Sequence, residues 1–461
     1  MTLIEILGFV AILCSAVVLH EFGHFIVAKL FKIRVETFSV GFGPRLFGKK
    51  WGNTDYRVSA IPLGGYVKLG GDESNAPIEG AGAVDIPEWE MFNLRPRWQR
   101  ILVAVAGPVM NVLTAMAIPM TIALMFGVPL SPAPIVSYVQ QSGAAQGAGL
   151  QPGDRIVSFN SIENPKWDSI AEDAALSPEQ TLPLVVERNG QRVTLNITPT
   201  QQTEDGEVYG SLDFVPDNGG YPVMVSEVGE NTPASEAGLQ AGDRIVNIDH
   251  EQVRSAGHVT EFVHEHKTQP ITLTVDRGGN KLDLTAKVRR LSDGTERLGF
   301  ATRDDYPINR VGVAGATAHA FRTNMEYLRM TGKVMRQVFA GKRSVRNTLS
   351  GPIGIYSAAS KSIERSGWAG FWGMLTLLSL NLGIFNLLPI PVLDGGAIFL
   401  LLLEGMLALI GMTLSTTVRE RIQQVGFVVV VLIMVFAVTN DLVKRFSRPP
   451  DGPSRPAATA K

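Results

Sequence analysis

The sequence predicts a mixed fold: a polytopic α-helical membrane protein that carries a water-soluble α+β insert. Long apolar stretches almost free of charge lie toward both ends of the 461-residue chain, whereas its middle is polar with regular turn signals. The middle part also repeats itself at a fixed spacing. A net charge of −1, with 18% charged residues, gives no indication of a nucleic-acid partner, and none is expected.

Four stretches are long and apolar enough to cross a bilayer, whose core of ~30 Å takes about 20 helical residues. They lie at about 6–28, 101–128, 368–388 and 425–438. The first is not expected to be a cleaved signal peptide, because Glu5 stands where a basic residue should be and no small-residue cleavage site follows. A fifth stretch, 397–414, contains Glu404, and a re-entrant or interfacial helix explains it as well as a span.

Basic residues give the expected orientation. Lysine and arginine gather over 29–100, between the first two stretches, and again at Arg419 and Arg421 before the last. Positive residues favour the cytoplasmic side, so the insert at 129–367 and both termini are expected outside. Basic residues in the tail, from Lys444 onward, run against this orientation.

The insert contains an internal duplication. Residues 134–157 align without gaps to 223–246, at an offset of 89, with thirteen of the 24 positions identical. At the same offset, the segment 184–188 matches 273–277, and each leads through a glycine-containing turn into a second strand-like segment. Two copies of a domain of ~90 residues are therefore predicted.

The shared motif AGLQ-x-GDRIV resembles the PDZ domains of bacterial proteases over about 133–200 and 221–290. The resemblance implies that each copy binds an extended peptide by strand addition to a sheet edge. Asp154 and Asp243 of the motif are interpreted as structural residues that shape a turn and cap backbone groups.

The expected domain boundaries follow from these features. They are 1–128 for the first two spans with a short β-rich membrane-associated loop, 129–205 and 206–305 for the two PDZ-like domains, 306–367 for an amphipathic helical segment, 368–445 for the last two spans, and 446–461 for a disordered tail.

The first apolar stretch contains the motif His20-Glu-Phe-Gly-His24. On a helix, residues four apart lie on one face, so both imidazoles can bind one metal ion, and Glu21 beside them can activate a water molecule. In a soluble protein a pair of surface histidines is the ordinary alternative. Three ionisable groups within a membrane helix are costly, however, and usually functional. The motif therefore predicts a zinc site in the cytoplasmic half of the bilayer.

A catalytic zinc usually has three protein ligands and one open position. The other histidines lie in the insert, so a carboxylate is expected as the third ligand, and Asp394 in the segment 386–396 is the candidate. Taken alone, Asp394 is explained better as the N-cap of the helix that follows. Beside the two histidines, the ligand is the favoured interpretation.

Several motifs together resemble the site-2 protease family. They are HEFGH in the first span, NLLPIPVLDGG after the third, GFG and PLGGYVK between the first two, SGPIGI at 350–355, and the tandem PDZ-like repeats. The resemblance implies that zinc is held by His20, His24 and Asp394, that Glu21 is the general base, and that Asn386, Pro389 and Pro391 hold the substrate backbone. Many members have a histidine after LDGG, where this chain has Ala397.

The resemblance also implies a function. An intramembrane zinc metalloendopeptidase of the bacterial inner membrane would cut single-span membrane proteins, such as an anti-sigma factor or signal-peptide remnants, within the lipid bilayer. Its active site would face the cytoplasm, and its periplasmic PDZ pair would exclude bulky substrates. The segment 56–68 would form either an ordinary cytoplasmic hairpin, or a hairpin or loop that dips toward the site and pairs with the unwound substrate as an added strand.

Two non-enzymatic alternatives are a membrane-anchored peptide-binding scaffold and a metal carrier. A scaffold has no need of Glu21 between two membrane histidines. A carrier would need ionisable groups along its path, and the second and fourth spans offer none.

Overall fold

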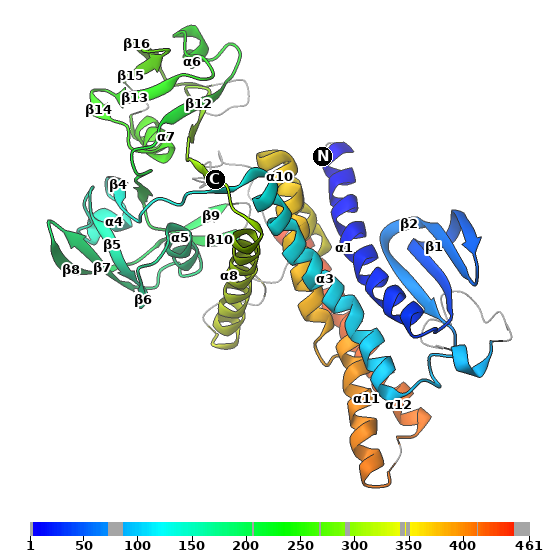
Figure 1. Ribbon diagram of the computed structural model, residues 1–461. Coiled ribbons are helices and arrows are strands. Elements are labelled where there is room, and N and C mark those ends of the chain that lie inside the picture. Colours follow the sequence, from blue (N-terminus) through cyan, green and yellow to red (C-terminus); the bar gives the residue numbers. More distant parts are fainter. Residues whose placement is uncertain are drawn as a thin grey trace. The chain divides into compact units, whose positions relative to one another are not determined.

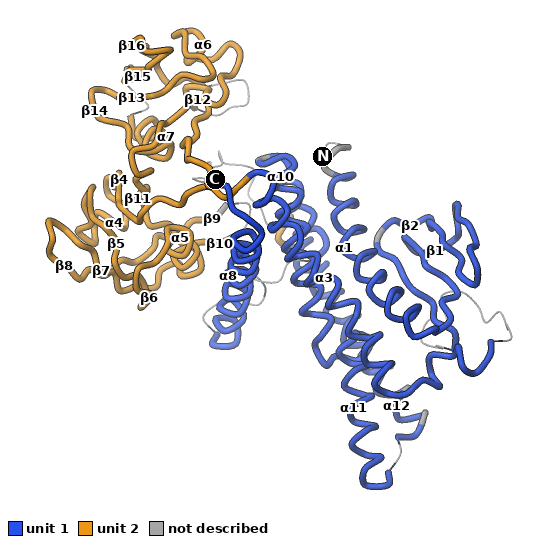
Figure 2. The backbone as a smooth tube through the Cα atoms, in the orientation of Figure 1, with its two compact units in different colours: residues 1–126, 310–443 blue, residues 127–309, 444–461 orange. Residues whose placement is uncertain are grey.

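The computed structural model describes residues 3–71, 86–204, 207–266, 269–290, 296–341, 346, 351–412 and 414–446 (Figure 1). The chain divides into two compact units, Met1–Phe126 with Arg310–Val443 and Gly127–Asn309 with Lys444–Lys461 (Figure 2). The first unit holds the long apolar helices and the second holds the insert. The tail expected to be disordered lies almost entirely outside the described residues.

Unit 1 is built mainly from helices. They are α1 (Leu3–Leu30), the 3₁₀ turn η2 (Glu88–Glu90), α3 (Arg97–Phe126), α8 (Val313–Phe339), α10 (Pro352–Asn386), α11 (Asp394–Leu409) and α12 (Thr416–Phe446). Four segments of the described chain are long and apolar enough to span a membrane, as predicted: Ile6–Leu30, Arg97–Phe126, Ser366–Asn386 and Thr417–Lys444. The 16 residues of α11 reach only about 24 Å, so this helix does not join them.

The helices of unit 1 approach one another closely where small residues meet. Helix α1 packs against α3 and α10, and α10 packs against α3. A Cβ added to Gly23 of α1 would lie 2.3 Å from the carbonyl oxygen of Ala106 in α3. Small interfacial residues are the usual means by which membrane helices come together. Helix α10 is broken at Gly367, whose φ of 55° separates its polar first part from the span.

A curled β-hairpin follows α1 and packs against it. Its strands β1 (Val35–Trp51) and β2 (Thr54–Leu69) both bend, so the first half of β1 lies between the two halves of β2. Phe38, for example, pairs with both Tyr56 and Val67. The bends fall at glycines with left-handed φ, such as Gly41 at 92° and Gly64 at 135°. The segment 56–68 is thus strand throughout and forms a hairpin with β1, which both expected alternatives allow.

The first repeat of unit 2 forms a four-stranded sheet in the order β6-β5-β7-β8, beside a β4–β11 pair. Its elements are β4 (Val136–Val139), α4 (Ala144–Gly147), β5 (Arg155–Phe159), β6 (Ile162–Glu163), α5 (Trp167–Ala175), β7 (Leu182–Arg188), β8 (Gln191–Ile197), the β9 (Thr200–Glu204) and β10 (Glu207–Ser211) hairpin, and β11 (Phe214–Pro216). Because β11 pairs with β4, residues beyond the expected boundary at 205 complete the first repeat.

The second repeat has the same order of elements and a sheet of order β16-β15-β13-β12-β19, with β14 beside β13. Its elements are β12 (Val223–Val228), α6 (Pro233–Glu236), β13 (Arg244–Ile248), β14 (Glu251–Gln252), α7 (Ala256–Glu265), β15 (Pro270–Arg277), β16 (Asn280–Lys287), the β17 (Arg289–Arg290) and β18 (Glu296–Arg297) pair, and β19 (Phe300–Asp304). The two ends of the insert meet where β3 (Val128–Pro129) pairs with β20 (Ile308–Asn309). The predicted mixed fold, with two small α+β repeats, is confirmed.

Candidate metal centre

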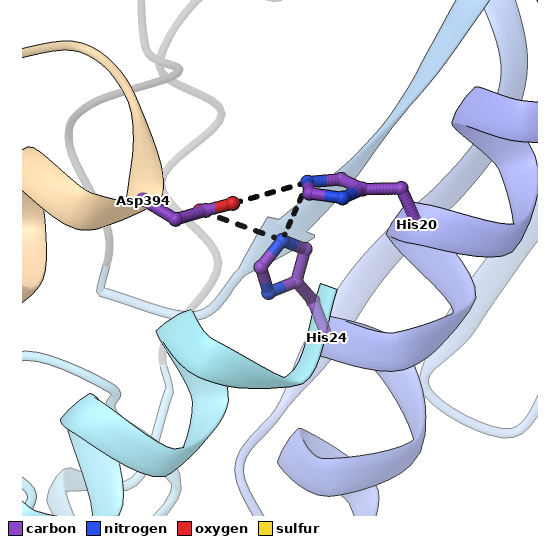
Figure 3. A group of neighbouring side chains, drawn as sticks. All are labelled: His20, His24 and Asp394. Atoms are coloured by element: carbon purple, nitrogen blue, oxygen red, sulfur yellow. Dashed lines mark hydrogen bonds and ion pairs between the residues drawn. The ribbon is translucent and has the colours of Figure 1, made fainter. Parts of the chain in front are cut away.

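Helix α1 places His20 and His24 one turn apart, and the start of α11 brings Asp394 to them (Figure 3). The two Nε2 atoms lie 3.2 Å apart. The Asp394 carboxylate oxygens lie 3.1 Å from Nε2 of His20 and 3.5 Å from Nε2 of His24. Residues 370 positions apart in the chain therefore present three potential ligand atoms to one another, all within 4.8 Å.

The three residues fit a zinc ion. Tetrahedral zinc with bonds of about 2.0–2.1 Å holds its ligand atoms roughly 3.3 Å apart, close to the separations seen here. Two imidazoles and one carboxylate are a donor set typical of catalytic zinc, which leaves a fourth position for water or substrate. The side chains of His20 and His24 are only 7% and 12% exposed, so the ligands are sheltered from bulk water.

The connection between α10 and α11 delivers Asp394 to this place. Helix α11 is capped by Leu393 without a side-chain hydrogen bond, so the carboxylate of Asp394 does not cap the helix and instead faces the histidines. A Cβ on Gly395 would lie 2.3 Å from the carbonyl oxygen of Leu387, and one on Gly396 would meet the backbone just as closely. The Gly-Gly pair thus allows the tight turn that starts α11 at the site.

Asn386 ends α10 beside the metal ligands, with its Nδ2 atom 3.3 Å from Nε2 of His20. Pro389 and Pro391 lie in the connection that follows. Pro391 packs against α12, where a Cβ on Gly426 would lie 2.2 Å from the proline Cβ. Asn386 therefore lies beside the metal ligands, whereas Pro391 contacts α12.

Glu21 lies between the ligands and the hairpin. Its carboxylate accepts a hydrogen bond from the backbone N–H of Val67 in β2. A Cβ on Gly65 of the same strand would lie 3.8 Å from the Glu21 Cγ. The second half of β2 thus runs past the residue expected to act as the base.

Helix α3 contacts the two imidazoles through three residues that the sequence analysis did not single out. The carbonyl oxygen of Val103 lies 2.7 Å from Nδ1 of His24, and the Asn111 amide lies 3.2 Å from Nδ1 of His20. Between them, a Cβ on Gly107 would lie only 2.3 Å from Nε2 of His24. A spacing of four places these residues on one face of α3. The available signal was Asn111, the only side-chain amide in the stretch 101–128.

Comparisons with known proteins agree with this geometry. The model of peptidase family M50 matches residues 8–433. Regulator of sigma-E protease RseP of Salmonella typhimurium is 32% identical over 463 residues, which cover 94% of this chain and 97% of the relative. The protein of that name from Escherichia coli K12 is 30% identical, over 95% and 98%. Among solved structures, the PDZ domain of an SdrC-like protein from Listeria innocua matches at 25% identity over 18% of this chain and 92% of that one, with a TM-score of 0.16.

Proposed function

The chain belongs to peptidase family M50 and is a zinc metalloprotease of the site-2 type, and we propose that it hydrolyses peptide bonds within the transmembrane segments of single-span membrane proteins. It is a multi-pass membrane protein with four candidate spans in the described chain. The observation that carries the proposal is the convergence of His20, His24 and Asp394 at a membrane helix. Ionisable side chains inside a span are costly and are usually functional, which supports this role for the site.

In this proposal each residue of the site has a separate role. His20, His24 and Asp394 hold the zinc ion, which when bound polarises the scissile carbonyl and lowers the pKa of water toward 7. Glu21 is the general base: it takes the proton from the attacking water and passes it to the leaving amine. Its position beside both histidines in the motif and its hydrogen bond to Val67 support this role.

The substrate must be unwound before it can be cut, because every carbonyl of a transmembrane helix is already hydrogen-bonded. We infer that the unwound segment adds as a strand beside the second half of β2, which passes Glu21. Asn386 supplies amide groups to the freed backbone beside His20. Pro389 and Pro391 shape the loop that presents it.

The chemistry is tested by incubating the purified protein with a single-span membrane substrate, with and without a zinc chelator. Cleavage should stop when zinc is removed and return when zinc is restored. The control is chelator already saturated with zinc, which should leave the rate unchanged. Full activity in protein shown by metal analysis to be free of zinc would refute the proposal.

The proposed location is a bacterial inner membrane, with the metal centre toward the cytoplasm and the insert in the periplasm. The basic residues between the first two spans support this orientation. Reporter fusions at positions 75 and 205, both outside the described residues, should be cytoplasmic and periplasmic respectively, and one at the C-terminus should be periplasmic. A cytoplasmic signal at 205 would invert the orientation.

We infer that the insert selects substrates by size, so that an anti-sigma factor or a signal-peptide remnant enters only after its outer domain has been shortened. The structure offers a sharp test because the backbone N–H of Leu130 donates to the carbonyl of Pro307. Residues 131–306 can therefore be replaced by a short glycine linker that leaves the β3–β20 pair in place. Substrates with long and short outer domains are then compared.

A size filter predicts that the deletion allows cleavage of the long substrate and leaves the short one unaffected. A recruiting role predicts slower cleavage of both, because a lost docking site lowers the local substrate concentration. Zinc content, measured in parallel, should not change in either case. Uniform slowing would contradict the filter.

A further inference from the structure

We propose that Asn111 is a positioning residue for the metal centre. Its side-chain oxygen accepts the Nδ1 hydrogen of His20 and so keeps Nε2 of that ring free as a ligand atom. The inference rests on the proposed zinc site and deepens it. It assigns a role to a residue on α3 that neither the HEFGH nor the LDGG motif contains.

The first observation is an unsatisfied buried atom. Asn111 is fully buried, its Nδ2 lies 3.2 Å from Nδ1 of His20, and its Oδ1 has no hydrogen-bond partner among the described residues. The Nε2 atom of His20 faces His24 and Asp394, so the hydrogen of the ring belongs on Nδ1 if Nε2 is to bind a metal. In that tautomer two N–H donors would face each other.

A half-turn of the terminal amide resolves both problems. The oxygen and nitrogen of a side-chain amide occupy nearly equivalent positions, so the rotation moves Oδ1 to the place now held by Nδ2. The buried oxygen then accepts from Nδ1 of His20, and neither atom of this pair is left without a partner. Two opposed N–H donors inside the membrane are unfavourable, which favours this arrangement.

The second observation is that His24 already has the equivalent partner on the same helix. Its Nδ1 lies 2.7 Å from the carbonyl oxygen of Val103, one of the strongest acceptors in a protein. Val103 and Asn111 are eight residues apart on one face of α3, with Gly107 between them leaving room for the rings. One helix thus supplies an acceptor behind each imidazole, and both Nε2 atoms point toward Asp394.

Loss of the amide would therefore act through His20 rather than on the substrate. Among the described contacts of His20, Asn111 is the one that meets Nδ1, and the others meet Nε2. Without it the ring can rotate or carry its hydrogen on Nε2, and in that tautomer it cannot bind zinc. Removing such an outer partner of a metal-binding histidine typically lowers metal affinity about 10–100-fold.

The test uses the full-length protein purified in detergent and three variants. Asn111→Leu removes the acceptor at similar volume, and Asn111→Asp keeps it. Asn324→Leu is the matched control, because Asn324 is also buried and donates to the Ala115 carbonyl of α3, and its Oδ1 also lacks a partner. Zinc affinity is measured by competition with a chelator, and the His20 tautomer by ¹⁵N spectroscopy of labelled imidazoles.

We expect Asn111→Leu to lose about 10–100-fold in zinc affinity, with Asn111→Asp and Asn324→Leu close to the parent. The parent should carry the His20 hydrogen on Nδ1, with or without zinc. Parent-like affinity in Asn111→Leu, or an equal loss in Asn324→Leu, would overturn the inference. So would a zinc-free parent with the His20 hydrogen on Nε2, a result that needs no variant to fold.

Failure of the proposed function looks different. If the parent protein itself bound no zinc, the metal centre would be refuted, and the role of Asn111 would fall with it. If the parent bound zinc and cut its substrate while the Asn111 variants behaved like the control, only the role of Asn111 would fail.

Discussion

Buried aspartates of two kinds distinguish the insert from the membrane unit. In the first repeat, the Asp154 carboxylate accepts from the backbone N–H of Gln151 at 2.9 Å and from Nε and Nη2 of Arg188 at 2.7 and 2.6 Å. In the second repeat, Asp243 has the same partners 89 residues later: the Gln240 N–H and the Arg277 guanidinium. Both carboxylates cap a backbone N–H, as the structural interpretation of the motif anticipated, and each is also neutralised by an arginine of its own repeat.

Asp394 is also largely buried but has a different environment. Among the described residues, no lysine or arginine pairs with it, and its oxygens face only His20 and His24. Imidazoles that bind a metal ion are neutral, so in a loaded site the carboxylate charge, which is costly inside a membrane, is balanced by the cation and not by another side chain. The comparison shows how a structural aspartate can be told from a ligating one: the first has its charge balanced by the fold, and the second leaves it for a cation.

The largest expected effect comes from removing a proposed zinc ligand from the membrane unit. His20→Ala or His24→Ala should abolish both zinc binding and proteolysis, because two remaining ligands hold a catalytic zinc poorly. Arg188→Ala, which unbalances Asp154 in the insert, should leave the zinc content unchanged. Metal analysis of the purified proteins measures both. Undiminished zinc in His20→Ala would remove His20 from the site.

Substitution of Glu21 tests the cleavage step separately from zinc binding. Glu21→Gln keeps the shape of the side chain but removes the base, so cleavage should slow about 10²–10⁴-fold while zinc is retained. The rate is measured on a single-span substrate, and zinc content serves as the control. Proteolysis close to the parent rate would eliminate Glu21 as the base.

Local patterns made much of this molecule predictable. Apolar length identified the four spans, helical spacing paired His20 with His24, and an offset of 89 revealed the repeats. Asp394 could be proposed because it closely follows the third span and the remaining histidines lie in the insert. These features depend on neighbours in the sequence or on composition alone.

The features that could not be predicted from the sequence depend on packing between segments that are distant in the chain. The importance of Gly107 and Asn111 appears only when α3 lies behind the two imidazoles of α1. Likewise, β2 turns back along both edges of β1, and β11 joins the first repeat through its pairing with β4. Strand partners of this kind are set by tertiary contacts, which one sequence does not specify.

A smaller effect is expected from breaking an aspartate pair in the insert. Arg277→Leu leaves the buried Asp243 without its charged partner, so the turn that Asp243 caps should open more often. The Arg277 guanidinium also holds the pKa of Asp243 below its ordinary value. We therefore expect faster hydrogen exchange in β13 and β15, with unchanged zinc and unchanged exchange in β5 of the first repeat. Lost zinc in this variant would contradict the independence of the two regions.

The smallest expected effect distinguishes the two repeats from each other. His258 of α7 is buried, stacks on Tyr138 of the first repeat at 5.0 Å, and has no hydrogen-bond partner at either ring nitrogen in the part of the chain that the structure describes. The position 89 residues earlier is Ser169, which does not titrate in this range. Burial, and then the nearby Arg254 charge, lower the pKa of His258 to about 4.

The sign of the pH effect follows from this shift. An unfolded histidine titrates near pH 6.5, so between about pH 6.5 and 4 the unfolded chain binds a proton that folded His258 does not. The stability of the second repeat should therefore fall as the pH drops through this window, by on the order of 1–2 kcal/mol, since the exposed Glu251 carboxylate 3.9 Å from Nε2 partly stabilises the charged ring. Hydrogen exchange in α7 at pH 7 and pH 4.5, compared with that in α5 after correction for the intrinsic rate, measures the difference.

His258→Phe preserves the stacking on Tyr138 without a titrating group, and its α7 should lose the pH dependence while the parent retains it. If His258→Phe kept the full pH dependence, another group would be responsible, and the two repeats would not differ in the way their sequences suggest.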